Sequence, residues 1–213
     1  MSARRLETAP APEEEALLRL ECLVAGYEQP VVGPLSFELR RGEAVGVTGP
    51  NGCGKSTLLR ALTGGARIHS GRALRAPGLR ISHQQQSFDR LEGFPLCGRE
   101  LLALTGALEA GLPPWLRDRL GQRLDRLSGG QLQFLRLWAC LMAPADLVLL
   151  DEPTNNLDPP SRGAVAAALA AWPGTMILVS HDVGFVQALA PHRVLTMPEG
   201  QLDHWSDDLL ELV

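Results

Sequence analysis

The feature that most constrains this chain is a glycine-rich run containing its only lysine. Residues 49–56 read Gly-Pro-Asn-Gly-Cys-Gly-Lys-Ser, which follows the pattern G-x-x-x-x-G-K-[ST]. A short run of small and β-branched residues, 44–48, precedes it, as expected for a strand buried on both faces, and a helical pattern begins at Lys55. Strand, glycine-rich turn and helix in this order predict a loop that binds the phosphates of a nucleotide.

Each part of this loop has an expected role. The glycines let the backbone amides face phosphate oxygens, Lys55 reaches the β- and γ-phosphates, and the hydroxyl of Ser56 takes a Mg²⁺ coordination position. The alternative is a glycine-rich turn that precedes a helix and has no ligand. We expect nucleotide contacts from Gly49, Asn51, Gly52, Cys53, Gly54, Lys55, Ser56 and Thr57.

Two adjacent carboxylates follow the apolar run 147–150, which is typical of a central strand. Burial in a low-dielectric region penalises two such charges unless a cation compensates them. We therefore expect Asp151 to hold Mg²⁺ through water, and Glu152 to act as the base that polarises an attacking water. The alternative is that the two side chains only cap the next loop.

Composition narrows the function classes. The chain has 213 residues, which is typical of one domain, and a formal net charge of −4 at pH 7, which disfavours an extended nucleic-acid groove. The start runs into proline and glutamate without a secretory signal, and the longest apolar run, 164–172, is too short to span a membrane. We expect a cytoplasmic protein without direct membrane insertion, and residues 1–16 as a flexible leader.

The remaining pattern predicts an α/β fold. Residues 18–27 and 35–39 alternate apolar and polar residues, which favours an antiparallel start, and later strands alternate with helices, which implies a parallel sheet. The segment 87–127 has no pattern typical of strands and is interpreted as a helical insertion. We expect helices at 97–105, 114–124, 129–142 and 160–171, and strands at 147–150, 175–180, 192–197 and 201–205.

Residues 127–131 read Leu-Ser-Gly-Gly-Gln and precede the 147–150 strand by about twenty residues. With the phosphate loop, this combination resembles the ATP-binding cassette (ABC) ATPases over residues 18–205. The resemblance implies a P-loop NTPase core with a mostly parallel sheet, an N-terminal antiparallel β portion, and a helical subdomain at about 87–142 within an ATPase domain of residues 17–213. It also implies that Ser128, Gly129, Gly130 and Gln131 bind the γ-phosphate of ATP held by a second copy of the chain.

The same resemblance assigns roles to isolated positions. Tyr27, the only tyrosine, matches the aromatic residue that stacks on adenine, although a packing role at a strand end is the alternative. His181, in Val-Ser-His-Asp, matches the histidine that contacts the γ-phosphate. Asp158 matches a loop that contacts the opposite subunit.

A glutamine after the strand at 80–83 matches the residue that touches Mg²⁺ and senses nucleotide. Gln86 fits this role best, and the neighbouring Gln84 and Gln85 leave the register open. The predicted helix 129–142, which begins within the Leu-Ser-Gly-Gly-Gln run, departs from the family pattern. Phe134 and Ala139 stand where arginine is common. These two departures put the usual ion pairs around that helix in doubt.

The resemblance implies two alternative processes to which ATP hydrolysis could be coupled. The first is transport through an integral membrane permease, and residues 77–81, Gln86 and 94–96 resemble zinc and manganese importer subunits. The second is a soluble, ribosome-associated or regulatory role, because residues 154–158 and 173–185 resemble ABC-F translation proteins. Those proteins carry two cassettes and a charged linker, whereas this chain has one cassette, so we expect a transporter subunit at the inner face of the membrane.

Overall fold

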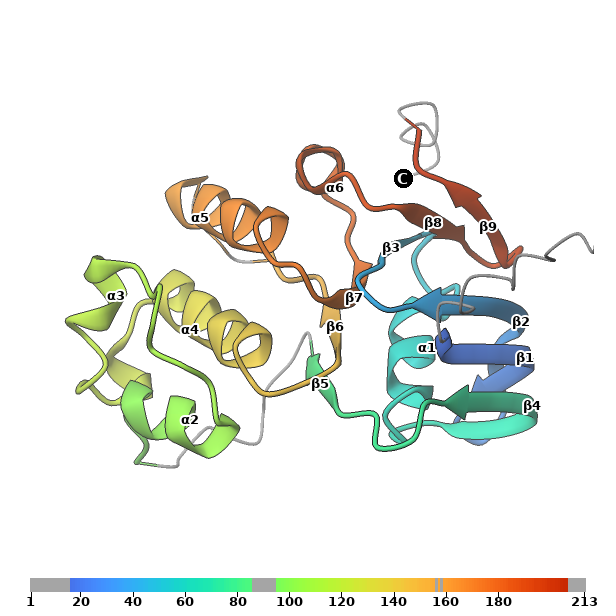
Figure 1. Cartoon of the computed structure of the whole chain (residues 1–213), viewed down its shortest axis with the longest axis horizontal. Helices are drawn as coiled ribbons and strands as arrows, with labels where there is room; N and C mark the ends of the chain where they lie inside the picture. The colour runs from blue at the N-terminus through green and yellow to red at the C-terminus, as the bar shows by residue number, and fades with distance from the viewer. Residues whose placement is uncertain (1–15, 86–94, 156, 158, 207–213) are drawn as a thin grey trace, which may run out of the picture.

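The computed structural model describes residues 16–85, 95–155, 157 and 159–206, which form two sheets with helices between and beside them (Figure 1). The first sheet is antiparallel, with the strand order β2-β1-β4. Its strands are β1 (Ala16–Gly26), β2 (Pro30–Arg40) and β4 (Arg67–Arg75). The predicted antiparallel start is confirmed, and the predicted leader lies outside the described residues except for Ala16, which begins β1.

The second sheet has the order β5-β6-β7-β3-β8-β9. Neighbours from β5 to β8 are parallel, and only the last pair, β8 and β9, is antiparallel. The strands are β3 (Ala44–Thr48), β5 (Ile81–Gln84), β6 (Leu147–Asp151), β7 (Thr175–Val179), β8 (Arg193–Thr196) and β9 (Gln201–His204). The predicted fold class, α/β with a mostly parallel sheet, is confirmed.

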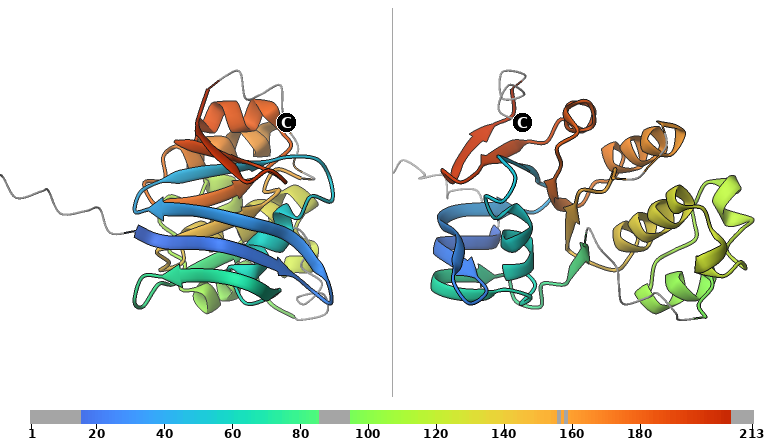
Figure 2. Two further views of the ribbon diagram at one scale, coloured as in Figure 1. Left: turned by 90° about the vertical axis from the view of Figure 1, so that its right-hand side faces the viewer. Right: turned by 180° about the vertical axis from the view of Figure 1, so that it is seen from behind.

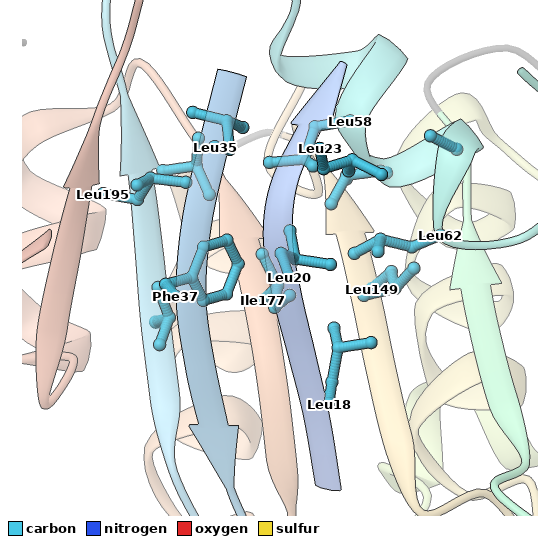
Figure 3. Packing of buried hydrophobic residues seen from close by; sticks show 14 of the residues in the cluster. Leu18, Leu20, Leu23, Leu35, Phe37, Leu58, Leu62, Leu149, Ile177 and Leu195 are labelled. Atoms are coloured by element: carbon cyan, nitrogen blue, oxygen red, sulfur yellow. The ribbon is translucent and has the colours of Figure 1, made fainter. Parts of the chain in front are cut away.

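Helices separate the sheets and cover the outer face of the second one (Figure 2). Helix α1 (Lys55–Ala61) lies between the two sheets, and its Leu58 belongs to one buried cluster with Leu20 and Phe37 of the first sheet and Leu149 of the second (Figure 3). On the other face lie α4 (Gly129–Leu141), α5 (Pro159–Ala170) and α6 (Val183–Leu189), and beyond α4 lie α2 (Gly98–Thr105) and α3 (Pro114–Arg117).

Strand β6 shows why the central strands are continuously apolar. Leu147 and Leu149 join the core that contains α1, whereas Val148 and Leu150 join the core formed with α4 and α5. Successive side chains of a strand point to opposite faces, so a strand covered on both faces has no polar side. This burial carries Asp151, the last residue of β6, into the interior at 2% exposure.

Three aromatic side chains pack together in the helical part of the fold, and one of them, Phe134, stands where the resemblance led us to expect arginine. The ring of Phe134 meets that of Trp115 edge to face at a centroid distance of 5.2 Å and stacks on Trp138 at 6.2 Å. The indole Nε1 of Trp138 donates to the carbonyl of Leu108 at 2.9 Å. Because Phe134 is 2% exposed, apolar packing stabilises α4 at a position where the family commonly carries a cation.

The prediction of one helix over 114–124 was wrong. Helix α3 ends at Arg117, and a separate 3₁₀ helix, Leu124–Arg126, follows. The carbonyls between them bind elsewhere: those of Leu120 and Gln122 accept from the first backbone amides of α2. These carbonyls satisfy amides that have no partner within α2, and they hold the segment in turns. Strand β4 and helix α6 were not predicted.

Candidate functional site

The phosphate loop lies between β3 and α1, as predicted. Gly54 precedes α1 with φ +100°, and a Cβ there would lie 2.8 Å from the Cβ of Val32. At Gly49, which has φ +138°, a Cβ would lie 2.3 Å from the carbonyl oxygen of Met197. Both positions therefore require glycine for backbone conformation and for space. The described geometry explains why the glycine spacing of the motif fits this strand and helix.

Lys55 is held inside the loop, with only 6% of its surface exposed. Its ammonium Nζ donates to the carbonyl oxygens of Gly49 at 2.7 Å and Pro50 at 3.0 Å, and lies 4.0 Å from Sγ of Cys53. An ammonium fixed on neutral carbonyls keeps its charge available to an anion that enters the loop. Its predicted contact with the β- and γ-phosphates remains a prediction.

Ser56 and Asp151 meet although they are far apart in the sequence. The Ser56 hydroxyl donates to Oδ1 of Asp151 at 3.1 Å. Burial raises the pKa of Asp151, and the hydrogen bond from Ser56 opposes that rise. A hydroxyl and a buried carboxylate are oxygen donors of the kind that Mg²⁺ takes, and the cation would offset the burial penalty, so the residues fit a Mg²⁺ site.

Glu152 is held in an unusual backbone conformation. Its φ is +52°, a region that residues other than glycine seldom occupy, and its amide donates to the Val179 carbonyl at 2.9 Å. Oε2 accepts the His181 backbone amide at 3.2 Å, and Oε1 lies 3.3 Å from His181 Nε2. Burial raises the pKa of the carboxyl group, the amide of His181 opposes this rise, and the nearby Asp151 charge adds to it.

These groups share one cavity of about 790 Å³, within the ~300–1,000 Å³ typical of small-molecule sites. Predicted site residues in its wall are Asn51, Gly52, Gly54, Lys55, Ser56, Thr57, Asp151, Glu152 and His181. The wall also contains Val31, Thr154, Asn155, Arg162, Val179 and Asp182, which the sequence analysis did not identify as site residues. The ammonium of Lys55, two carboxylates and the imidazole of His181 thus line one cavity.

Tyr27 follows β1 and is 45% exposed, outside the wall of that cavity. Its hydroxyl accepts a hydrogen bond from Nη1 of Arg60 on α1 at 2.8 Å. The ring is therefore held near the helix that follows the phosphate loop, and its exposed surface is free to stack on a flat ligand. Arg60 was not singled out by the sequence, because a contact between two such distant residues leaves no local pattern.

Residues 128–131, which are predicted to bind the γ-phosphate, form the start of α4, far from the phosphate loop in the sequence. The backbone amide of Ser128 donates to Oε1 of Gln131 at 3.0 Å, and the amide of Gln131 donates to Oγ of Ser128 at 3.3 Å. This reciprocal capping fixes the first turn of α4. Ser128 and Gly129 are exposed, Gly130 and Gln131 are partly exposed, and none of the four lines the cavity described above.

Two predicted residues, Gln86 and Asp158, lie outside the described residues. Of the alternatives for the glutamine, Gln84 ends β5 opposite Leu150, is 2% exposed, and has an amide group without a hydrogen-bond partner among the described residues. Gln85 is exposed. The choice among the three glutamines therefore stays a prediction.

Taken together, the phosphate loop, the buried carboxylate beside Ser56 and the restrained Glu152 define the class of P-loop nucleotide-binding proteins. A family model described as ABC transporter matches residues 32–93 and 100–155. The chain belongs to this family, the ABC ATPases, and family membership implies that it binds and hydrolyses ATP.

The relatives that match this chain include proteins named for metal import and for translation. The zinc import ATP-binding protein ZnuC of Paracoccus denitrificans (strain Pd 1222) is 38% identical over 81% of this chain and 71% of its own length. The energy-dependent translational throttle protein EttA of Escherichia coli (strain K12) is 29% identical over 85% of this chain but only 35% of its own length. A solved ATP-binding subunit of an ABC transporter has a TM-score of 0.74, with 23% identity and 92% of each chain covered, which shows the shared fold.

Proposed function

We propose that this chain is the ATP-hydrolysing subunit of an ABC transporter and that it drives substrate movement through a separate integral membrane permease. The single observation that carries the hydrolysis proposal is the meeting of Ser56 with Asp151 at 3.1 Å in the same cavity as Lys55 and Glu152. A cation donor set, a phosphate-binding ammonium and a restrained base are the parts that phosphoryl transfer to water needs.

In the proposed reaction each of these residues has one task. Lys55 and the loop amides hold the β- and γ-phosphates. Ser56 and Gln86 would supply oxygen ligands for Mg²⁺, and Asp151 would hold the cation through water. Bound Mg²⁺ neutralises charge that develops on the phosphate oxygens. Glu152 accepts a proton from the attacking water, and His181, whose amide already binds Glu152, contacts the γ-phosphate.

We also propose that two copies of the chain form a complete site. Ser128, Gly129, Gly130 and Gln131 are at least partly exposed and lie outside the wall of the phosphate-loop cavity in their own chain. They are therefore available to the γ-phosphate held by the loop of a second copy, where the amides at the start of α4 favour an anion. Hydrolysis would then remove the ligand that bridges the two copies and reopen the dimer.

We favour a membrane permease over a ribosome as the partner that ATP hydrolysis drives, and we favour zinc over other transported substrates. The ZnuC relative matches along 71% of its length, as a single cassette would, whereas EttA matches along only 35%. None of the helices in the described part of the chain combines the length and apolar character needed to cross a bilayer. The proposal places the chain at the inner membrane face through its permease, with no direct contact to nucleic acid.

The test is to express tagged Glu152→Gln protein in the source organism, solubilise it gently with ATP present, and identify copurifying proteins by mass spectrometry. Recovery of a polytopic membrane protein supports the transporter. Growth of a deletion strain under zinc limitation, restored by the wild type and not by Lys55→Ala, supports zinc as cargo. Ribosomal proteins without a membrane protein would overturn the proposal in favour of a translation role.

A further inference from the structure

An ion pair links the helix that follows the Asp158 loop to the loop that carries His181. Helices α5 and α6 pack against each other on the outer face of the second sheet (Figure 1). Nη1 of Arg162, in the first turn of α5, lies 3.1 Å from Oδ2 of Asp182, which directly precedes α6. Both side chains line the cavity that contains Lys55 and Glu152. The pair therefore lies in the wall of the site, and neither residue has a role in the reaction proposed above.

Asp182 is held from three directions. Its Oδ1 accepts the amide of Phe185 at 3.1 Å and so caps α6, while its own amide donates to Oγ of the buried Ser180 at 3.1 Å. Its second oxygen, Oδ2, is the atom that meets Arg162. His181 lies between Ser180 and Asp182 in sequence, so whatever fixes Asp182 also limits how far the His181 backbone can move.

His181 itself depends on such restraint. Its side chain is 43% exposed, and the described contacts that hold it on the site are its backbone amide on Oε2 of Glu152 and its Nε2 near Oε1 of the same carboxylate. Tight packing does not fix a side chain with this much exposure. The position of the imidazole is therefore set by the backbone on either side of it. Among the described ion pairs, the one from Arg162 on α5 to the Asp182 side chain reaches this segment from another helix.

We propose that Arg162 is a positioning residue for ATP hydrolysis, which holds the His181 loop against Glu152 by anchoring Asp182; this inference rests on the proposed function of the same site. The side chains of Arg162 and Asp182 are 49% and 25% exposed, and ion pairs with such exposure contribute little to folding stability. A role in positioning therefore predicts a loss of turnover much larger than the loss of stability.

The competing role for Arg162 is direct binding of a phosphate, because its side chain also faces the cavity. The two roles differ in what Asp182 does. If Arg162 binds phosphate itself, removing its charge weakens ATP binding, and neutralising Asp182 frees the cation and does not mimic that loss. If Arg162 acts through Asp182, neutralising either partner has the same effect, and the effect falls on turnover more than on binding.

Four variants separate these roles: Arg162→Met, Arg162→Lys, Asp182→Asn, and the double variant that combines Arg162→Met with Asp182→Asn. Asparagine is as good a helix N-cap as aspartate, so Asp182→Asn removes the charge and keeps the cap on α6. We expect kcat to fall about tenfold in Arg162→Met and in Asp182→Asn, with KM for ATP within about threefold of the wild type, and no further fall in the double variant. Arg162→Lys should recover most of the activity, and Tm should change by less than about 4 °C.

Hydrogen exchange supplies a measurement that does not need turnover. In the nucleotide-free protein, the amides of Asp182 and Phe185 donate to side chains of this loop, and the amide of His181 donates to Glu152. We expect these amides to exchange severalfold faster in Arg162→Met, with the phosphate loop unchanged. Unchanged exchange, a rise in KM confined to Arg162→Met, or additive losses of kcat in the double variant would each overturn the proposal. Faster exchange without turnover in the wild type would instead mean that the proposed function fails while the restraint is real.

Discussion

Replacement of Glu152 by glutamine separates the chemistry of this site from its folding. Glutamine has the same shape, its carbonyl oxygen can accept the His181 amide that Oε2 accepts now at 3.2 Å, and its NH₂ group can lie where Oε1 faces the imidazole. The variant therefore keeps the local contacts and loses only the carboxylate charge. We expect its effects on turnover and on stability to have opposite signs.

The magnitude for turnover follows from the role of a general base. Removing such a group costs about 10²- to 10⁴-fold in rate, or about 3 to 5 kcal/mol in activation free energy. ATP binding should be unaffected within about threefold, because the phosphate contacts of Lys55 and the loop amides do not involve residue 152. Single-turnover hydrolysis at saturating Mg·ATP measures the first effect, and a nucleotide titration of the same preparation measures the second.

The direction of the stability change in Glu152→Gln follows from the burial of the Glu152 carboxyl group. Burial raises the pKa of Glu152 above its ordinary value of 4.5, so folding favours the protonated form and disfavours the carboxylate. The stability that this group contributes is present below about pH 4.5 and is lost as the pH rises through the higher pKa of the folded state. Glu152→Gln should thus have an equal or higher Tm near pH 7 without nucleotide. A rate within about threefold of the wild type, or a lower Tm together with lost ATP binding, would refute the reasoning.

Substitutions at three further positions, two in the candidate site and one in β5, test other parts of the molecule. Lys55→Ala should weaken ATP binding by about 1.5 to 3 kcal/mol, or roughly 10- to 150-fold in Kd, by calorimetry. Tyr27→Phe should bind a fluorescent ATP analogue as the wild type does, whereas Tyr27→Ala should bind it about 2- to 10-fold more weakly; equal losses would point to the hydrogen bond from Arg60 instead of the ring. Burial lowers the pKa of His83 to about 4, so between pH 6.5 and 5 urea denaturation should show a loss of about 1 kcal/mol that His83→Gln lacks.

The parts of the site that sequence predicts are those in which local order fixes geometry. A phosphate loop is one continuous turn between a strand and a helix, so its residues can be named from their spacing. Asp151 and Glu152 can be named in the same way, because the apolar run 147–150 marks a buried strand and the two carboxylates follow it directly. Ser56 and Asp151 were both assigned to Mg²⁺, and they meet in the structure because parallel strands end at a common edge.

What the sequence leaves open depends on contacts between distant segments. Arg162 and Asp182 meet through the packing of α5 on α6, which no local pattern encodes. Strand β4 was missed because Ser70 and Gly71 interrupt its apolar residues and its pairing with β1 is irregular there. Helix α6 was missed because it is short, although the aspartate that caps it offered a signal.

The most direct test of the central claim, a site completed by a second copy of the chain, is the mass of Glu152→Gln protein in solution with Mg·ATP, measured by light scattering after size exclusion. The account predicts twice the 23.0 kDa of one chain with ATP, and the single-chain mass with ADP or when Ser128→Arg is added. A single-chain mass in a sample shown by titration to have ATP bound, or a dimer that survives Ser128→Arg, would contradict it.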